Sequence, residues 1–276
     1  MGSHRDVPLP IIDISPYLDA SQSTRRGETA AALNAACVEH GFFYLTGLDI
    51  PSSTTECVLE LARRFFLQCS PQEKSAIRRR DPGDGDGDGA RGYQEIGENV
   101  TKGRRDWHEA IDFYAEHHHD AASGPVPPYE LLGGRNLWPS HPPELRGAFE
   151  DYLTDVKRIG TAVVRAMGDA LGFDEDDSAE GEGPDVFVRA TERSLWVLRM
   201  IGYPGLSEQS DSDDAEQFSC GEHTDYGCLT LLLADSTPDA LQVQTKAGEW
   251  ISADPLPGAF VVNIGDMIER WTNGLW

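Results

Sequence analysis

The sequence predicts an α+β protein in which helices pack around a β-sandwich or jelly roll. Two observations lead to this fold class. Apolar residues recur at helical spacing in several segments of the front half, whereas short apolar runs separated by turn residues dominate the back half. Helices followed by a run of strands are typical of such folds. A chain of 276 residues is long enough to bury a sizeable core in one or two domains.

Helices and strands of the front half are each predicted from a local pattern. Ser52 or Ser53 can cap a helix, and Gly41 and Gly172 follow the last apolar positions of two others. Prolines around the first apolar run favour an edge strand, because proline cannot donate to a sheet ladder. The predicted helices are Thr24–His40, Ser52–Gln68 and Leu145–Leu171, and the predicted strands are Val7–Ile14 and Phe42–Thr46.

The back half is predicted to contain four short strands. Each is a run of five to seven mostly apolar or β-branched residues between turn residues: 195–201, 229–233, 241–245 and 260–264. Between the acidic loop near residue 85 and Tyr114, the sequence is a polar stretch to which neither period assigns an element. No internal repeat is present.

The net charge of −24 is concentrated in three Gly- and Ser-rich stretches. Asp81–Asp88, Asp174–Asp185 and Glu208–Glu216 contain sixteen acidic residues and no Lys or Arg. These stretches are predicted to be solvated loops, although adaptation to high salt would produce a similar bias. Nucleic acid and anionic membranes are excluded as partners of so acidic a surface. The expected partner is a small-molecule substrate, and no obligate protein partner is inferred.

Other features of the composition indicate a cytoplasmic protein. No run of eighteen apolar residues exists, and the first ten residues lack the apolar segment of a signal peptide. The five cysteines include no Cys-x-x-Cys pair, so a reduced chain is expected.

His223 and Asp225 form the most informative pair of polar residues. If this segment is extended, side chains two positions apart point to the same face. An imidazole and a carboxylate that converge there suit a divalent metal such as iron(II), and a facial triad would need one further histidine. A His-x-Asp tripeptide alone is a weak signal, so its context decides.

Short motifs in a consistent order supply that context. They are Pro10–Ile14, His40–Tyr44, Phe65–Lys74, Arg91–Gln94, Gly97–Thr101, Asp106–Phe113, Asn136–Pro139, Tyr203–Pro204, Gly221–Asp235, Pro257–Met267 and Trp271–Gly274. Together they resemble the isopenicillin N synthase-like family of 2-oxoglutarate/iron(II)-dependent oxygenases. The resemblance extends along nearly the whole chain, and chance does not supply so many ordered matches.

The resemblance implies a double-stranded β-helix (jelly-roll) core with a helical N-terminal region. It divides the chain into a non-haem dioxygenase N-terminal region at 1–120, a connecting segment with a long helix at 121–190, and an oxygenase jelly-roll region at 191–276. His223 and Asp225 would be iron ligands and catalytic residues. Tyr203 would bind the co-substrate, since the family places a tyrosine there that hydrogen-bonds its carboxylate.

The implied activity is that of an iron(II)- and 2-oxoglutarate-dependent dioxygenase that uses O₂. Its substrate would be a small organic molecule, and hydroxylation, desaturation and ring closure are all compatible with the motifs. Two alternatives stay open: an iron-dependent oxidase that does not use 2-oxoglutarate, and a jelly-roll binding protein that has lost catalysis.

One family feature does not occur in the sequence. The family's second histidine ligand and its Arg-x-Ser pair would follow Trp271–Gly274, yet no histidine follows His223 and the sequence ends at Trp276. We therefore expect a fragment that lacks the last core strands and has low activity. An upstream ligand, His108 or one of His117–His119, is the less favoured explanation.

Three other patterns invite a functional interpretation that we do not favour. Asp84–Glu95 matches a calcium-binding loop, but Arg91 occupies a position that is usually aliphatic, so a solvated loop is preferred. Cys220 and His223 form a lone Cys-x-x-His without the second pair of a zinc site. Asp106 and Glu109, three residues apart, are predicted to be a charged helix face.

Overall fold

The computed structural model describes residues 9–84, 87–116, 132, 134–173, 185–192, 194–205 and 219–276. Contacts divide the chain into two compact units. Unit 1 comprises Met1–Thr55, Tyr152–Ser194 and Thr224–Trp276, and unit 2 comprises Glu56–Asp151 and Leu195–His223. Each unit is assembled from separate segments of the chain. The division at residues 120 and 190 stays a prediction about sequence regions.

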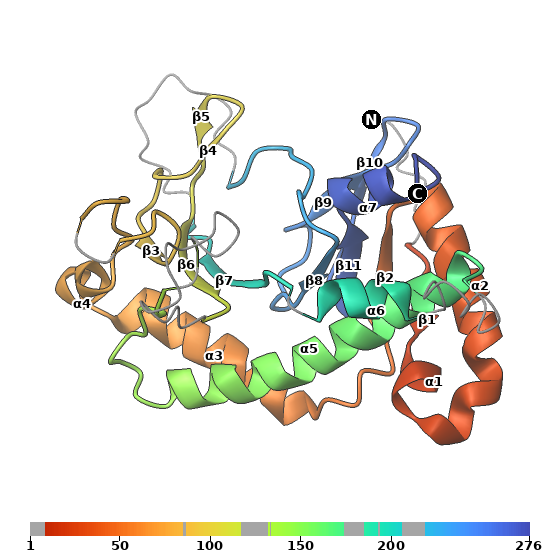
Figure 1. The fold of residues 1–276 in the computed structure, drawn as a ribbon. Helices are drawn as coiled ribbons and strands as arrows, with labels where there is room; N and C mark the ends of the chain where they lie inside the picture. The colour runs from red at the N-terminus through yellow and green to blue at the C-terminus, as the bar shows by residue number, and fades with distance from the viewer. Residues whose placement is uncertain are drawn as a thin grey trace. The chain divides into compact units, whose positions relative to one another are not determined.

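Unit 1 is built on a four-stranded sheet in the order β1-β2-β11-β8 (Figure 1). β1 (Ile11–Asp13) pairs in parallel with β2 (Phe42–Thr46), and β11 (Phe260–Ile264) runs antiparallel to β2 and to β8 (Leu229–Leu232). The edge position predicted for the first strand is confirmed, within the part of it that the structure describes. The predicted bounds of β2 and β11 agree with the observed ones.

Apolar side chains of β2 and β11 form the core of unit 1. Phe260 lies opposite Leu45 and Val262 opposite Phe43, and all four side chains are fully buried. Packing of aromatic and branched side chains across paired strands is what stabilises such a sheet. The aromatic run near residue 43 therefore supplies the centre of the unit.

Helices of unit 1 pack their apolar faces on this sheet and on one another. α2 (Arg26–Glu39) buries Leu33 completely and follows a short 3-10 helix, η1 (Ala20–Arg25), and α1 (Ser15–Leu18). It ends before Gly41, whose φ of +71° suits glycine, and whose N–H donates to Ala36 O.

The remaining elements of unit 1 come from the second half of the chain. The part of α5 from Tyr152 onward belongs to this unit, and the Tyr152 ring meets Phe260 edge-on. The ring of Phe187 stacks on Trp271, joining two short helices. The bounds of these elements are α5 Leu145–Ala170, α6 Val186–Thr191, α7 Asp266–Trp271, β9 Gln242–Gln244 and β10 Trp250–Ser252.

Unit 2 contains a three-stranded antiparallel sheet in the order β3-β6-β7. Gly202 at the end of β7 lies against the Phe66 ring, where an added Cβ would be 2.7 Å from the nearest ring atom. Ser70 and Glu73 form a capping box at the start of α4. The bounds are α3 Ser52–Gln68, α4 Pro71–Ala76, β3 Gly92–Gln94, β4 Val100–Thr101, β5 Arg104–Arg105, β6 Glu109–Tyr114 and β7 Val197–Gly202.

Two sequence interpretations are wrong in unit 2. The polar stretch before Tyr114 contains four strands, and its longest strand, β6, is the centre of the sheet. Asp106 and Glu109 do not lie on a helix face, because Glu109 begins β6 and Asp106 precedes it. A search for alternating apolar residues misses this strand, because two of its buried side chains are acidic. Their partners, described below, explain why it is stable.

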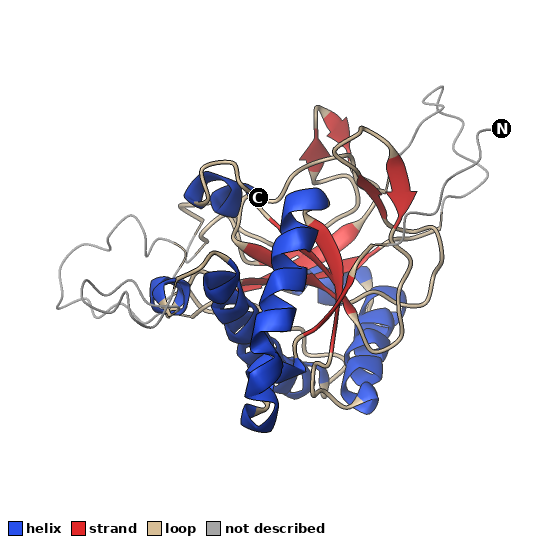
Figure 2. Ribbon diagram, turned by 90° about the vertical axis from the view of Figure 1, so that its right-hand side faces the viewer, coloured by secondary structure: helices blue, strands red, loops and turns tan. Residues whose placement is uncertain are grey.

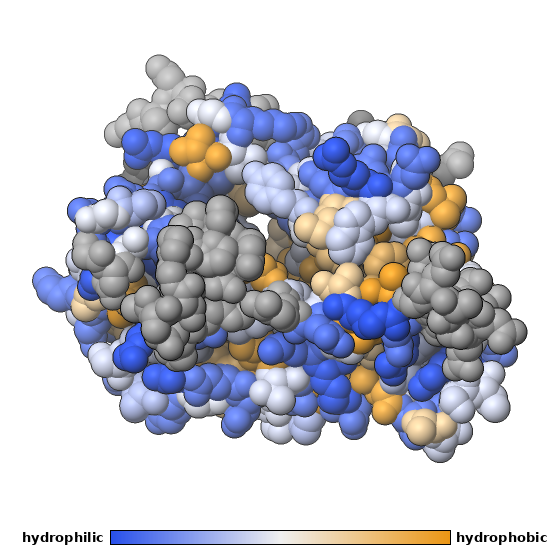
Figure 3. Space-filling model, viewed as in Figure 1, coloured by the Kyte–Doolittle hydropathy of each residue, from blue (hydrophilic) through white to orange (hydrophobic). Residues whose placement is uncertain are grey.

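The described residues combine helices with short strands, as Figure 2 shows. None of the described helices is both long and apolar enough to cross a membrane. Hydrophilic residues cover most of the face in Figure 3, and a hydrophobic patch lies over the β4–β5 hairpin, where Val100 is exposed. His117–His119 and most of the two later acidic stretches lie outside the described residues.

Candidate active site

The predicted metal-ligand pair lies in a loop that precedes β8. Residues 221–225 have no regular secondary structure, and the strand begins only at Leu229. The alternation of an extended strand therefore does not apply to His223 and Asp225. His223 is the last residue of unit 2, and Asp225 belongs to unit 1.

The carboxylate of Asp225 is held by two side chains of the unit 1 sheet. Thr230 Oγ1 and Asn263 Nδ2 both donate to Asp225 Oδ2, at 2.5 Å and 2.8 Å. Thr230 on β8 and Asn263 on β11 are paired in register, which brings the two donors together. Hydrogen bonds of this kind orient carboxylates that bind metals. The register of the sheet thus fixes the direction of the carboxylate.

Backbone packing also holds the Asp225 segment. The N–H of Asp266 donates to Asp225 O at 2.8 Å, at the start of α7. Gly265 lies so close that an added Cβ would be 2.7 Å from Asp225 O and 2.4 Å from Gly227 O. Only glycine fits this approach without displacement of the backbone. The Asn263–Asp266 segment therefore holds the backbone of the Asp225 loop in place.

The imidazole of His223 is exposed and hydrogen-bonds within its own loop. Its Nδ1 lies 2.9 Å from Gly221 O and 3.8 Å from Cys220 Sγ. A backbone carbonyl is an acceptor, so this contact assigns the ring proton to Nδ1. In that tautomer Nε2 carries the lone pair that a metal requires. The ring chemistry fits the role of a metal ligand.

Residues near the start of β6 hold the loop that leads to His223. Asp106 Oδ1 accepts from Gly221 N at 3.0 Å, and His108 Nδ1 lies 2.9 Å from Ser219 O. Lys102 on the β4–β5 turn pairs with Glu222. Three of the four positions before His223 are thus tied to one region of unit 2. Sequence reasoning missed this function of Asp106 and His108, because nothing local links them to residue 220.

Tyr203, the predicted co-substrate ligand, lies in the same region. Its ring meets the His108 ring edge-on, with 5.6 Å between centroids. Although 54% of the residue is exposed, desolvation of its hydroxyl, and then the neighbouring Cys220 and Asp106, raise the pKa of Tyr203 to about 12. The phenol is therefore neutral at pH 7 and available as a hydrogen-bond donor.

Two buried acids of β6 are neutralised by basic partners. Asp112 forms a two-pronged ion pair with Arg199 on β7, with both N–O distances at 2.6 Å. Glu109 accepts from Lys74 Nζ at 2.8 Å and from the Tyr93 hydroxyl at 2.5 Å. Buried charges require such partners. These pairs explain how the central strand buries two acidic side chains among apolar ones.

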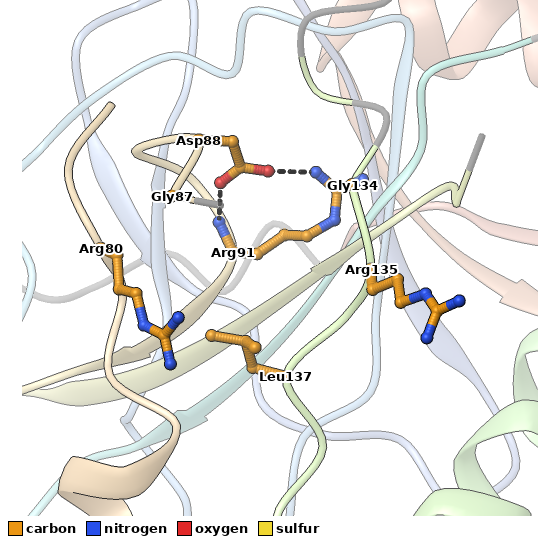
Figure 4. A pocket seen from close by; sticks show the side chains of 7 residues that line it. All are labelled: Arg80, Gly87, Asp88, Arg91, Gly134, Arg135 and Leu137. Atoms are coloured by element: carbon orange, nitrogen blue, oxygen red, sulfur yellow. Dashed lines mark hydrogen bonds and ion pairs between the residues drawn. The ribbon is translucent and has the colours of Figure 1, made fainter. Parts of the chain in front are cut away.

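None of the predicted ligands lines a small pocket in unit 2 (Figure 4). Arg91 crosses it, buried, and pairs with Asp88. Asp88 Oδ1 also accepts from the N–H groups of Ala90 and Arg91. Desolvation alone would raise the pKa of Asp88, but these hydrogen bonds outweigh it and lower that pKa. The lining residues are Arg80, Gly87, Asp88, Arg91, Gly134, Arg135 and Leu137.

These contacts bear on the calcium-like motif. Asp88 was predicted to be a solvated residue of an acidic loop. That prediction is wrong, because Asp88 anchors the buried Arg91. Glu95 lies just after β3 and contacts Arg78 at 3.5 Å. The two residues are thus used by the fold, which agrees with the interpretation that the motif is not a calcium loop.

Comparisons with known proteins identify the family. Residues 9–141 match the non-haem dioxygenase in morphine synthesis N-terminal model, and residues 195–275 match the 2OG-Fe(II) oxygenase superfamily model. Homoarginine-6-hydroxylase 2-ODD-C23 of Glycine max is 38% identical over 97% of this chain and 78% of its own length. This chain belongs to the 2OG-Fe(II) oxygenase superfamily.

Further relatives support the same family assignment. Homoarginine-6-hydroxylase 2-ODD-233 of rice is 36% identical over 97% of the chain and 78% of its own length. A full-length Neurospora crassa protein, crystallised with alpha-KG and 5-formyluracil, is 26% identical, with a TM-score of 0.76 over 99% of this chain and 77% of that one. The structural relatives share the jelly-roll fold, as the sequence predicted. That the last core strands are missing stays a prediction.

Membership in the superfamily decides the reaction class. The chain is an iron(II)- and 2-oxoglutarate-dependent dioxygenase that uses O₂ and acts on a small organic substrate. The predicted cofactors are confirmed. The two alternatives, an oxidase independent of 2-oxoglutarate and a binding protein without catalysis, are disfavoured by this result.

Proposed function

We propose that this oxygenase hydroxylates a small cationic amino acid of the homoarginine type. The observation that carries this proposal is the set of four plant relatives named homoarginine-6-hydroxylases, which are 36–38% identical over 97% of the chain. A net charge of −24 supports it, because the field of an acidic protein raises the local concentration of cations. The substrate would carry a guanidinium group and an α-amino acid group.

In this proposal, His223 and Asp225 bind the iron and Tyr203 binds the carboxylate of 2-oxoglutarate. Three observations on separate residues support these roles. The tautomer of His223 presents Nε2 as a donor atom, Thr230 and Asn263 orient the Asp225 carboxylate, and Tyr203 is a neutral phenol. These roles are those of the isopenicillin N synthase-like group, in which we place the chain.

Bound iron(II) would supply the activation of O₂ by 2-oxoglutarate, which no protein side chain provides. The residues of the chain orient the metal-binding side chains. Asn263 and Thr230 keep the Asp225 carboxylate in one direction, and Gly221 O keeps the His223 ring in one tautomer. Asp106 and His108 restrain the backbone on which His223 stands. Preorganisation of this kind reduces the cost of assembling the centre.

The direct test is an assay with iron(II), 2-oxoglutarate and homoarginine. We expect succinate formation that depends on homoarginine, together with a product heavier by one oxygen atom in mass spectrometry. Arginine, which is one methylene group shorter, and lysine, which carries an ammonium in place of the guanidinium, serve as comparisons. A site that recognises the guanidinium by hydrogen bonds should strongly discriminate against lysine.

Variants separate the ligand proposal from the substrate proposal. His223→Ala and Asp225→Ala should each abolish succinate formation with every substrate, whereas Cys57→Ser, at an exposed cysteine, should leave it unchanged. The Neurospora crassa protein was also crystallised with thymine, so thymine is included as a competing substrate. Turnover of thymine but not homoarginine would refute the substrate class and leave the iron ligands standing. Full activity in Asp225→Ala would refute the ligand assignment.

A further inference from the structure

Unit 2 brings three metal-binding side chains together at the start of β6. The ligand atoms of Asp106, His108 and Cys220 lie within 4.8 Å of one another. Asp106 and His108 are 4% and 3% exposed, and Cys220 is half-buried. The cysteine comes from a distant part of the sequence. A carboxylate, an imidazole and a thiol are all side chains that bind divalent transition-metal ions.

The electrostatics of this cluster differ from those of the other acids in unit 2. Asp112 pairs with Arg199, Glu109 with Lys74, and Asp88 with Arg91. Among the described residues, Asp106 has no such basic partner, and it accepts only from Thr101 Oγ1 at 2.8 Å and Gly221 N at 3.0 Å. A buried carboxylate without a nearby positive charge is costly. A bound cation would provide the missing charge.

We propose that Asp106, His108 and Cys220 bind a divalent ion of the zinc class, at a site separate from the iron ligands. The donor set determines the class of ion. Thiolate, imidazole and carboxylate are all zinc ligands, whereas calcium and magnesium avoid sulfur. Three protein ligands leave a fourth, tetrahedral position for water. The lone Cys220-x-x-His223 motif gave no reason to expect this, because Asp106 and His108 come from elsewhere.

The hydrogen bonds of His108 are compatible with metal binding. One ring nitrogen lies 2.9 Å from Ser219 O and the other 3.3 Å from the Asn99 amide nitrogen. An ion would replace one of these contacts, and the other would keep the ring oriented, as outer hydrogen bonds do for histidine ligands. The Cys220 thiol would bind as thiolate and release its proton to solvent.

The ion would tie the residues around Cys220 to the start of β6. Cys220 stands between Ser219 and Gly221, which already contact His108 and Asp106. Because His223 follows closely, with its Nδ1 3.8 Å from Cys220 Sγ, the second ion would stiffen the backbone that carries this residue. This consequence for the iron centre depends on the proposed role of His223. The binding of the ion itself does not.

Cobalt(II) is the probe that distinguishes the two sites. It replaces zinc and iron(II), and it produces an intense near-ultraviolet charge-transfer band only when a thiolate is bound. We expect the purified chain to develop this band on titration with cobalt(II), and zinc to remove it by competition. Cys220→Ser should abolish the band, and Asp106→Asn and His108→Ala should weaken cobalt binding at this site by more than roughly tenfold.

Matched controls use other residues of the chain. Cys57→Ser removes an exposed thiol outside the cluster and should leave the band intact. Asp225→Ala should also retain it, although the proposed iron site is destroyed in that variant. Zinc should protect one thiol of the wild-type chain, but none in Cys220→Ser, from a thiol-specific reagent. This second measurement requires no variant at a buried position.

The outcomes decide the proposal. A band that depends on Cys220 and survives Asp225→Ala supports a second site. No thiolate band, or a band that persists in Cys220→Ser, overturns it and leaves the cluster as a hydrogen-bonded anchor. A band that is lost in both Cys220→Ser and Asp225→Ala also overturns it, because the sulfur would then belong to the iron centre.

Discussion

Unit 1 and unit 2 both bury apolar side chains around a sheet, yet unit 2 also buries most of the polar and charged side chains that the structure describes as buried. In unit 1 the paired strands β2 and β11 bury Phe43, Leu45, Phe260 and Val262. In unit 2 the central strand β6 buries Glu109 and Asp112. Of the seven buried polar or charged residues among those described, only Thr29 lies in unit 1; the others are Arg91, Gln94, Asp106, His108, Glu109 and Asp112.

This difference determines how each interior is stabilised. The cost of shortening an apolar side chain in unit 1 should rise with the volume that is lost. Buried ion pairs depend on both partners, so unit 2 is sensitive to the loss of one member and less sensitive to the loss of both. The following variants test this contrast, from the largest expected effect to the smallest.

Phe43→Ala should have the largest effect on stability. Removal of a fully buried ring leaves a cavity in the sheet of unit 1, and we expect a loss of about 3–5 kcal/mol in the free energy of unfolding. Phe43→Leu is the control, with a smaller loss. Urea denaturation measures both. Equal stability of Phe43→Ala and wild type would contradict the assigned core.

Lys74→Met should destabilise unit 2 by about 3 kcal/mol, because the buried carboxylate of Glu109 would lose its cationic partner and keep only the hydrogen bond from Tyr93 among the contacts described above. The double variant Lys74→Met/Glu109→Gln should recover at least half of that loss. A double-mutant cycle in urea measures the coupling. If the two single losses simply add, the polar interior of unit 2 is not coupled as described.

Asn263→Ala should weaken iron binding about 10–100-fold, because it removes a hydrogen bond that orients Asp225. Thr230→Val, which is nearly isosteric, removes the other donor and should act in the same direction. Calorimetric titration with iron(II) without oxygen provides the affinity, and urea denaturation controls for stability. Unchanged affinity in both variants would refute the orienting role. This test asks whether the polar contacts of Asp225 in unit 1 serve the metal.

Asp88→Asn should have the smallest effect, about 0.5–1.5 kcal/mol at pH 7 from weakened charged hydrogen bonds to Arg91. The pKa of Asp88 is lowered in the folded protein, so its contribution is present above the unfolded value of 3.8 and is lost as pH falls through the folded value. The difference between variant and wild type should therefore narrow below about pH 4. Asp81→Asn, at an exposed position of the same loop, is the control. A pH-independent difference would show that charge is not the cause.

The sequence predicted the apolar elements well, but it missed the central strand of unit 2, which contains buried acidic residues. Local signals placed α2, α3, α5, β2 and β11 within a few residues of their observed bounds. The same reasoning assigned no element to β6 and a helix face to Asp106 and Glu109. A buried acid looks like a surface residue unless its partner is known. Lys74 and Arg199, which neutralise β6, lie far from it in the sequence.

The sequence by itself determined the fold class, the oxygenase family and the His223-x-Asp225 motif, because periodicity, caps and short motifs are properties of neighbouring residues. Only the tertiary structure decided that Thr230 and Asn263 hold Asp225, since that contact depends on the register of β8 against β11. It alone brought Asp106 and His108 to Cys220. Contacts between distant segments depend on which strands pair and in which register. Neighbouring residues in the sequence do not determine that pairing.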